Sequence, residues 1–229
     1  MLCRFFELDL IFGQVVIARL GSGMKINNPS AHSDRCVNCS CSLEIAAGAI
    51  LEAGAEILQI RHKGHWTRDL FEQARRVALL CEQARVPLVI NDRADIALLL
   101  NSALHIGQDD MPPADARRLI GATATLGYST HNAAQLTLAA EEPVNYLALG
   151  PIFATQSKMN PDPVVGLAQL REWRRLATKP LVAIGGITRQ SARSVLEAGA
   201  DSVAIIGDLL PADCSPASIR ARFEEWKRL

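Results

Sequence analysis

The 229-residue sequence lacks the features that mark membrane, secreted and nucleic-acid-binding proteins. No apolar run approaches the ~18 residues that cross a bilayer, and Glu7 and Asp9 interrupt the apolar start of the chain, where a signal peptide would be continuous. The 24 basic side chains equal the 24 acidic ones, so no net basic field attracts nucleic acid or a membrane surface. We therefore expect a cytoplasmic protein that binds neither nucleic acid nor membranes.

Cysteines and nucleotide-binding motifs are also sparse. Six cysteines are too few for a disulfide scaffold at this length. Cys36, Cys39 and Cys41 crowd together near His32, yet one C-x-x-C without a second spaced pair is a weak zinc signal, and we assign the cluster no metal or redox role. The sequence contains neither a Walker loop nor a G-x-G-x-x-G run.

What the sequence does contain is a repeated alternation of strand-length and helix-length segments from residue 44 onward. The strand candidates are apolar throughout, which is typical of parallel strands buried on both faces. They lie at Glu56–Ile60, Pro87–Ile90, Leu104–Ile106, Thr123–Leu126, Tyr146–Leu149, Leu181–Ile184 and Ser202–Ile206. The helix candidates include Leu43–Glu52, Arg68–Ala84, Ala114–Ile120, Asn132–Ala140, Leu167–Ala177 and Ser191–Ala198.

The number of these units predicts the fold. Seven strands are visible and an eighth must precede the first helix, so eight βα units indicate an α/β fold, the (β/α)8 TIM barrel of usually ~250 residues, as a single domain over residues 1–229. The first strand lies within residues 1–40, at Gln14–Leu20 or Met24–Ile26. The repeat of Leu51-Glu-Ala-Gly-Ala55 as Leu196-Glu-Ala-Gly-Ala200 favours the barrel over the alternative, an open doubly wound sheet.

Polar side chains follow most of the predicted strands. The segments concerned are Arg61-His62-Lys63, Asn91-Asp92-Arg93, Gly107-Gln108-Asp109-Asp110, Gly127-Tyr128-Ser129-Thr130-His131, Ala154-Thr155-Gln156-Ser157-Lys158 and Gly185-Gly186-Ile187-Thr188. In a parallel barrel all these strand ends share the face where barrel active sites are built. The opposite ends of the strands offer nothing comparable, and this asymmetry indicates an enzyme.

The charged residues among them suit a phosphate compound and a divalent cation. Arg61 and Lys63 point the same way and, with Gln59, are suited to hold a phosphate or diphosphate. Asp92 and Asp110 end adjacent strands, and Mg²⁺ usually takes one or two carboxylates together with phosphate oxygens. The structural alternative is a set of salt bridges among these acids and the neighbouring arginines.

Glycines and histidines give weaker signals. Gly185-Gly186 and Gly207 follow the seventh and eighth strands, where barrels bind phosphate through backbone N–H groups. We interpret His131 as the start of a helix and His105 as a core strand residue, with His62 and His65 on the surface. No histidine stands at a recognisable spacing from a Ser or Cys nucleophile.

Taken in order, six strand-end motifs resemble those of the thiamine phosphate synthase family. They are Gln-x-Arg-x-Lys at 59–63, Asn-Asp-Arg at 91–93, His-x-Gly-Gln-x-Asp at 105–110, Gly-x-Ser-x-His at 127–131, Gly-Pro-Ile-Phe-x-Thr-x-Ser-Lys at 150–158 and Ile-Gly-Gly-Ile at 184–187. Each motif is weak by itself, but all six in order make a specific match that runs from about Leu43 to Leu210.

The resemblance implies a (β/α)8 barrel that joins 4-amino-2-methyl-5-(diphosphomethyl)pyrimidine to 4-methyl-5-(2-phosphoethyl)thiazole and releases diphosphate. It implies that Asp92 and Asp110 hold Mg²⁺. The pyrimidine diphosphate would contact Gln59, Ile60, Arg61, His62, Lys63, Asn91, Ser129 and Lys158. The thiazole phosphate would contact Thr155, Gln156, Ser157, Gly186, Ile206 and Gly207.

The implied chemistry needs charge neutralisation more than a protein base. Diphosphate leaves a benzylic-type carbon, so Arg61, Lys63 and Lys158, with Mg²⁺, would act as the catalytic groups that stabilise the departing charge. The thiazole nitrogen then attacks a pyrimidine cation, which requires positioning. Homo-oligomer formation is left open.

The chain departs from the family pattern at three positions, and three rival functions are considered beside the synthase. His62 stands where the family often has Glu, Ser157 where Thr is common, and Gly207 where Ser is usual. A related thiazole tautomerase resembles this barrel but lacks the metal-binding acids and carries His at the position of Pro151. The second rival is a non-catalytic barrel that binds phosphate ligands, and the third is a phosphosugar isomerase, for which we find no acid–base pair.

Overall fold

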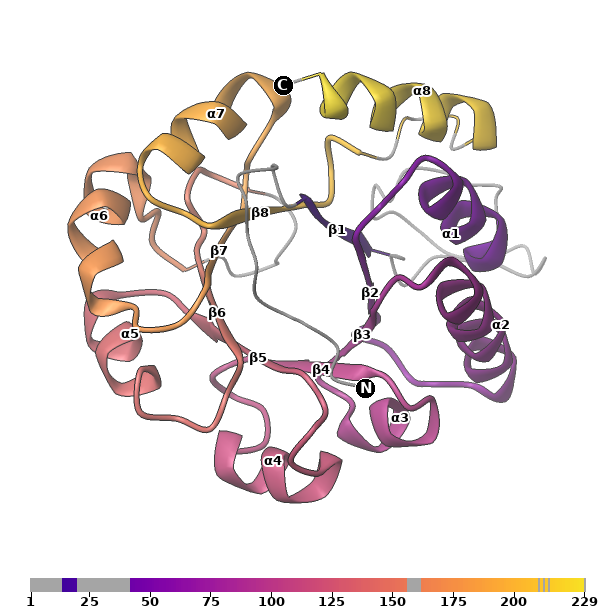
Figure 1. Ribbon diagram of the computed structural model, residues 1–229, viewed down its shortest axis with the longest axis horizontal. Coiled ribbons are helices and arrows are strands. Elements are labelled where there is room, and N and C mark those ends of the chain that lie inside the picture. The colour runs from indigo at the N-terminus through magenta and orange to yellow at the C-terminus, as the bar shows by residue number, and fades with distance from the viewer. Residues whose placement is uncertain are drawn as a thin grey trace, which may run out of the picture.

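The computed structural model describes residues 14–19, 42–155, 162–209, 211, 213 and 215–228. Within them, eight parallel strands form one closed barrel in chain order (Figure 1). The strands are β1 (Gln14–Arg19), β2 (Ile57–Arg61), β3 (Leu88–Asn91), β4 (Ala103–Ile106), β5 (Leu126–Thr130), β6 (Tyr146–Leu149), β7 (Leu181–Ile184) and β8 (Ser202–Ile205). The predicted TIM barrel is therefore confirmed.

The helices form an outer ring around the strands, and α8 lies beside α1 where the ring closes (Figure 1). They are α1 (Leu43–Glu52), α2 (Arg68–Ala84), α3 (Ala94–Leu99), α4 (Pro113–Ile120), α5 (Ala133–Ala139), α6 (Gly166–Trp173) with the 3-10 helix η1 (Arg174–Leu176), α7 (Arg189–Glu197) and α8 (Pro216–Lys227). Ser42, Thr67, Asn132 and Ser215 begin four of them, each side chain accepting a backbone N–H three residues on at 2.9–3.3 Å.

Barrel closure depends on β1, the strand that the sequence left ambiguous. It pairs with β2, where Val16 faces Leu58, and with β8, where Val16 faces Ile205. The alternative at Gln14–Leu20 is thus confirmed, whereas Met24–Ile26 lies outside the described residues. The open doubly wound sheet is wrong, because such a sheet would leave β1 and β8 unpaired with each other. The single-domain assignment stays a prediction.

Alternate side chains along the strands separate two environments. Large aliphatic residues such as Leu58, Ile60 and Leu104 face the helices and are at most 1% exposed. They pack against helix residues such as Val77 and Phe223 in one continuous core. The intervening residues face the barrel interior, where the functional groups lie.

The expected strand Thr123–Leu126 is wrong. β5 begins at Leu126 and continues to Thr130. Its residues that face the interior are Gly127 and Ser129, so the strand contains no apolar run that marks it. The criterion of continuous hydrophobicity fails where a barrel strand places small and polar groups beside a cavity.

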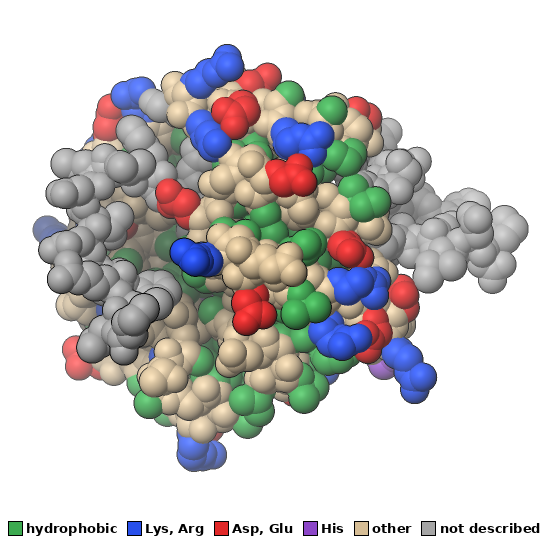
Figure 2. Space-filling view, turned by 45° about the vertical axis from the view of Figure 1, so that its right-hand side comes forward, with side chains coloured by type: hydrophobic (Ala, Val, Ile, Leu, Met, Phe, Trp, Pro, Cys, Tyr) green, Lys and Arg blue, Asp and Glu red, His purple; other side chains and the backbone are tan. Residues whose placement is uncertain are grey.

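Charges of both signs intermix on the helical face that Figure 2 shows, with apolar side chains between them. Arg76 Nε of α2 contacts Glu44 Oε2 of α1 at 2.6 Å, one of several exposed ion pairs. No helix in the described part of the chain has the length and apolarity that crossing a membrane demands.

Two leucines of α5 allow a matched test of this packing. Leu136 is fully buried, whereas Leu138 is 74% exposed. We expect Leu136→Ala to lower the free energy of unfolding by about 2–5 kcal/mol, because it removes transfer energy and leaves a cavity. Leu138→Ala should change it by less than about 0.5 kcal/mol. Urea unfolding followed by circular dichroism measures both, and equal losses would contradict the packing described for α5.

Candidate active site

A cavity of about 530 Å³ lies among the carboxyl ends of the strands and is lined by side chains from β2 to β8. One side, the polar half, consists of Gln59, Arg61, Asn91, His105 and Ser129 from β2 to β5. The other side, the apolar half, consists of Ala148, Val182, Ile184, Ala204 and Ile206 from β6 to β8 and its end. The cavity thus fits a planar ring that has polar atoms along one edge and apolar faces.

His105 is the centre of a buried hydrogen-bonded group in the polar half. Its Nδ1 lies 2.9 Å from Tyr146 Oη and its Nε2 lies 2.8 Å from Ser129 Oγ. The imidazole stacks on the Tyr146 ring at 5.5 Å between centroids. Burial lowers the pKa of His105 to about 4, because desolvation disfavours the imidazolium, and burial also raises the pKa of Tyr146. Both groups are therefore uncharged at neutral pH.

Two carboxylates meet beside the polar half. Asp92 follows β3 and contacts both Asp110 and the Lys63 ammonium. Asp110 Oδ2 accepts the backbone N–H of Gly107 at 2.7 Å. Desolvation, followed by the neighbouring Asp110 carboxyl, raises the pKa of Asp92 to about 6, although Lys63 opposes the shift. Asp110 retains a lowered pKa through its hydrogen bonds.

The backbone conformation at Asp92 determines where its carboxylate lies relative to Asp110. Asp92 has a φ of +66°, which is uncommon for a residue other than glycine, and its N–H donates to His105 O at 2.8 Å. The turn directs the carboxylate toward Asp110 instead of continuing the strand. Carboxyl groups held in mutual contact suit a divalent cation, which relieves their repulsion.

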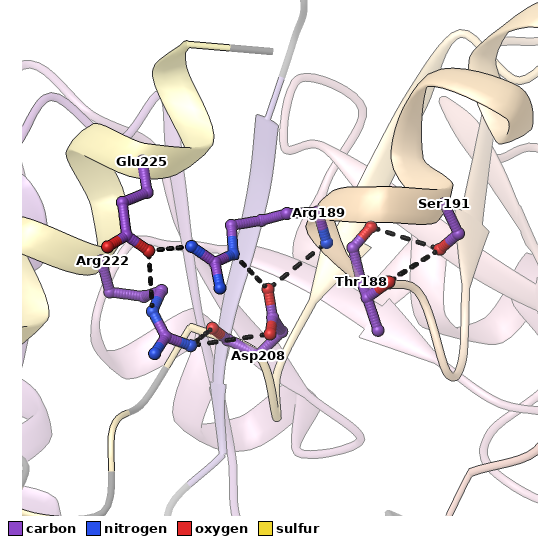
Figure 3. Close-up of polar contacts among 6 residues, drawn as sticks. All are labelled: Thr188, Arg189, Ser191, Asp208, Arg222 and Glu225. Carbon is purple, nitrogen blue, oxygen red and sulfur yellow. Dashed lines mark hydrogen bonds and ion pairs between the residues drawn. The ribbon is translucent and has the colours of Figure 1, made fainter.

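The opposite side of the cavity offers backbone N–H groups. Gly186 has a φ of +65°, and a Cβ there would lie 2.5 Å from Ala154 O, so the chain approaches too closely for a side chain. Thr188 and Ser191 form a capping box at the start of α7, with Thr188 N donating to Ser191 Oγ at 2.9 Å. Figure 3 shows the contacts of the Ser191 hydroxyl with the Thr188 oxygens. Thr155, Gly186 and Gly207 all line the cavity here.

A charged cluster holds the turn after β8 in place. Asp208 Oδ2 lies 3.2 Å from Arg189 Nε, and Arg222 Nη1 donates to Asp208 O at 2.9 Å (Figure 3). Both guanidinium groups also contact Glu225 (Figure 3). The cluster contains two cations and two anions, so it links the Gly207 turn to α7 and α8 without adding net charge.

Comparison with known proteins identifies the family of this chain. A family model described as thiamine monophosphate synthase matches residues 33–209. The chain belongs to the thiamine monophosphate synthase family. Thiamine-phosphate synthases of Koribacter versatilis and Chloroflexus aurantiacus are 50% and 42% identical to it, over 72% and 75% of this chain and 78% and 82% of their own lengths.

A solved structure agrees with this family. Thiamine phosphate pyrophosphorylase from Pyrococcus furiosus superposes with a TM-score of 0.72 at 26% identity, over 93% of this chain and 96% of that one. As a member of the thiamine monophosphate synthase family, the chain is a transferase that acts on small molecules and produces thiamine phosphate. The synthase predicted from the strand-end motifs is confirmed, in preference to a tautomerase, an isomerase or a non-catalytic barrel.

The structure brings most of the predicted synthase residues together. Gln59, Arg61, Asn91, Ser129, Thr155, Gly186, Ile206 and Gly207 line the cavity. Lys63, Asp92 and Asp110 meet beside it. The Ile60 side chain, in contrast, is buried against the helices, and the His62 ring packs edge-on against Trp66 at 6.0 Å, so neither side chain lines the cavity. Gln156, Ser157 and Lys158, like the cysteine cluster, lie outside the described residues.

Sequence reasoning missed several cavity residues, among them His105, Tyr146 and His131. His105 is a buried strand residue as expected, but it faces the cavity, as does Tyr146. His131 precedes α5 and lines the cavity, with its Nδ1 donating to Gly150 O at 2.6 Å. Strand parity agrees with the position of Tyr146, which lies two residues before the cavity residue Ala148 on the same strand.

The donor chemistry at Asp92 and Asp110 fits Mg²⁺, which commonly takes one or two carboxylates and completes its shell with phosphate oxygens and water. The described residues contain no cluster of three or more His, Cys, Asp or Glu that would form an all-protein metal cage. A cation held by Asp92 and Asp110 would complete its shell with phosphate oxygens or water.

The raised pKa of Asp92 makes a prediction for the metal-free protein. Since folding raises this pKa from 3.8 to about 6, the associated stabilisation is present below pH 3.8 and is lost as pH rises through about 6. We expect wild-type stability to fall by about 1–3 kcal/mol across that window through this group, and Asp92→Asn to remove the fall. Urea unfolding in EDTA between pH 4 and pH 7 measures it.

Asp95→Asn provides the matched control. Asp95 follows Asp92 by three residues, but it is exposed and pairs with Arg93, which lowers its pKa. That variant should keep the wild-type fall in stability between about pH 4 and pH 6. If Asp92→Asn keeps the fall as well, the pKa of Asp92 is not raised as described.

Proposed function

We propose that this synthase joins 4-amino-2-methyl-5-(diphosphomethyl)pyrimidine to 4-methyl-5-(2-phosphoethyl)thiazole with Mg²⁺ held by Asp92 and Asp110. The observation that supports it most is the contact of these two carboxylates with each other and with Lys63, directly beside the cavity. An acid pair and a cation together suit a metal–diphosphate complex, because the pair binds the metal and Lys63 binds phosphate oxygens.

The two halves of the cavity suit the pyrimidine ring. Gln59 and Asn91 are at most 5% exposed and present amide groups to the ring's nitrogen atoms and exocyclic amine. Ala148, Val182 and Ala204 offer a flat apolar surface for its face and methyl group. The ring would lie inside the barrel with its diphosphate directed to the charged residues at the strand ends.

The proposed first step is departure of diphosphate from the methylene carbon. The C–O bond breaks, its electron pair leaves with the diphosphate, and the positive charge spreads over the aminopyrimidine ring. Arg61 and Lys63 stabilise the departing anion through charge-assisted hydrogen bonds, and Lys158 is proposed to join them. Asp92 and Asp110 would hold Mg²⁺, which would supply further neutralisation of the diphosphate charge.

The second step forms the C–N bond. The thiazole phosphate is proposed to bind across the cavity, with its phosphate at the N–H groups of Gly186 and Gly207 and the hydroxyl of Thr155, and with Gln156 and Ser157 beside it. Its ring nitrogen donates a lone pair to the methylene carbon. No proton is removed in this step, so a neutral His105 is consistent with it.

Product formation tests the proposal. The purified protein is mixed with both substrates and Mg²⁺, with EDTA in a parallel sample, and thiamine phosphate is quantified. We expect Mg²⁺-dependent product from wild type and a loss of at least about a hundredfold in Asp92→Asn, with activity retained in Asp95→Asn. Full activity of wild type in EDTA, or of Asp92→Asn with Mg²⁺, would contradict the metal assignment.

Gly207 supports a gain-of-affinity prediction. An added Cβ at this position meets no atom within 4 Å, so a side chain fits without displacing the turn. Gly207→Ser should therefore keep the fold and lower the KM for thiazole phosphate between about twofold and tenfold, since one hydroxyl adds about one hydrogen bond. The KM for the pyrimidine diphosphate should stay unchanged. Steady-state kinetics with each substrate varied in turn measures both, and an unchanged thiazole KM would remove Gly207 from that phosphate site.

The cytoplasmic location and the homo-oligomeric state stay predictions from the sequence. Gel filtration combined with light scattering measures the oligomeric state directly.

A further inference from the structure

One layer of the barrel interior is built from His105, Gly127 and Tyr146. Strand register places His105 of β4 opposite Gly127 of β5, and Gly127 opposite Tyr146 of β6. The two rings therefore flank a residue without a side chain. A Cβ on Gly127 would overlap the Tyr146 ring and lie 2.5 Å from His105 Nδ1. The glycine is what allows the two rings to meet.

Both ring nitrogens of His105 are engaged, one on Tyr146 and the other on Ser129. Because the imidazole is neutral, one nitrogen donates and the other accepts. The chain from Tyr146 through His105 to Ser129 therefore has two allowed directions. In one, hydrogens point from Tyr146 toward Ser129, and in the other they point back toward Tyr146.

We propose that Tyr146 is a positioning residue whose hydroxyl donates to His105 Nδ1, keeps the imidazole proton on Nε2 and so leaves the Ser129 hydroxyl hydrogen free for the substrate diphosphate. This inference rests on the proposed function, in which Ser129 contacts the pyrimidine diphosphate. Tyr146 acts through two other side chains and contacts no reacting atom in this scheme.

The direction of these hydrogen bonds matters because the Ser129 hydroxyl has a single hydrogen to donate. Diphosphate oxygens only accept hydrogen bonds, so Ser129 must donate to them. If Ser129 donated to His105 Nε2 instead, its oxygen lone pairs would face the diphosphate and repel it. With Nε2–H donating to Ser129 Oγ, the hydroxyl becomes a polarised donor directed into the cavity.

The tautomer can be measured in the protein without substrate. Long-range ¹H–¹⁵N spectra distinguish a protonated ring nitrogen from a bare one, and the His105→Asn variant identifies the His105 signals among those of the five histidines. We expect a single tautomer protonated on Nε2 in wild type and a mixture in Tyr146→Phe. A wild-type His105 protonated on Nδ1 would overturn the proposal whether or not Tyr146→Phe folds.

Kinetics tests the consequence for substrate. Tyr146→Phe should lower kcat/KM for the pyrimidine diphosphate by about three- to tenfold, the effect of one hydrogen bond, and leave the KM for thiazole phosphate unchanged. Tyr128→Phe is the matched control, because the other tyrosine of the chain lies on β5 and packs in the outer core. It loses a hydroxyl that also has a side-chain partner, Gln108, and should retain wild-type kinetics.

A double-mutant cycle separates positioning from general stabilisation. If Tyr146 acts only through Ser129, then adding Tyr146→Phe to Ser129→Ala should cause no further loss of kcat/KM. Additive losses would show that Tyr146 acts by another route and would overturn the proposal. Unchanged kinetics in Ser129→Ala alone would instead refute the assignment of Ser129 to the diphosphate, which belongs to the proposed function, while the NMR result would still report the tautomer.

Discussion

The site depends on the two-residue alternation of side chains along eight short strands closed into a barrel. Because every second residue faces the helices, large aliphatic groups such as Leu104 and Ile106 can make the core without entering the interior. The interior positions are thereby released from packing and hold polar or small groups. A slip of one residue in any strand would exchange the two sets, so closure through β1 fixes the register on which the cavity depends.

Neutral polar groups and charged groups occupy different depths of the barrel. The deep interior contains neutral groups, since burial keeps both His105 and Tyr146 uncharged. Charged groups lie at the strand ends, where Lys63 contacts the carboxyl pair. Desolvation and, after it, the neighbouring Asp110 carboxyl raise the pKa of Asp92, so repulsion adds to the cost of ionising both acids. Binding of a divalent cation and a diphosphate would relieve that repulsion, which links substrate binding to the electrostatics of the unliganded site.

The fold and the charged part of the site were predictable from sequence because they leave local signals. Apolar runs marked most strands, and Asp92 and Asp110 stand shortly after two of them. The repeated Leu-Glu-Ala-Gly-Ala segments proved to be equivalent turns, with Gly54 and Gly199 at positive φ between a helix and the next strand. The bounds of β5 were predicted wrongly because small and polar residues that face the interior interrupt its apolar pattern. The contact of His105 with Tyr146 was not predicted for a different reason. It joins residues 41 positions apart, and the strand register that brings them together leaves no local pattern in the sequence.

A neutral hydrogen-bonded interior also suits the reaction proposed for the site. A carboxylate beside the methylene carbon would attract the developing cation and compete with the thiazole nitrogen for it. The described cavity lining from β3 to β5 instead includes an amide, a hydroxyl and an uncharged imidazole. Uncharged groups of this kind distinguish donor atoms of the substrate from acceptor atoms only through the direction of their hydrogen bonds. Fixing one tautomer of His105 therefore gives the interior a defined donor pattern, and Gly127 preserves it by leaving room for the two rings to meet.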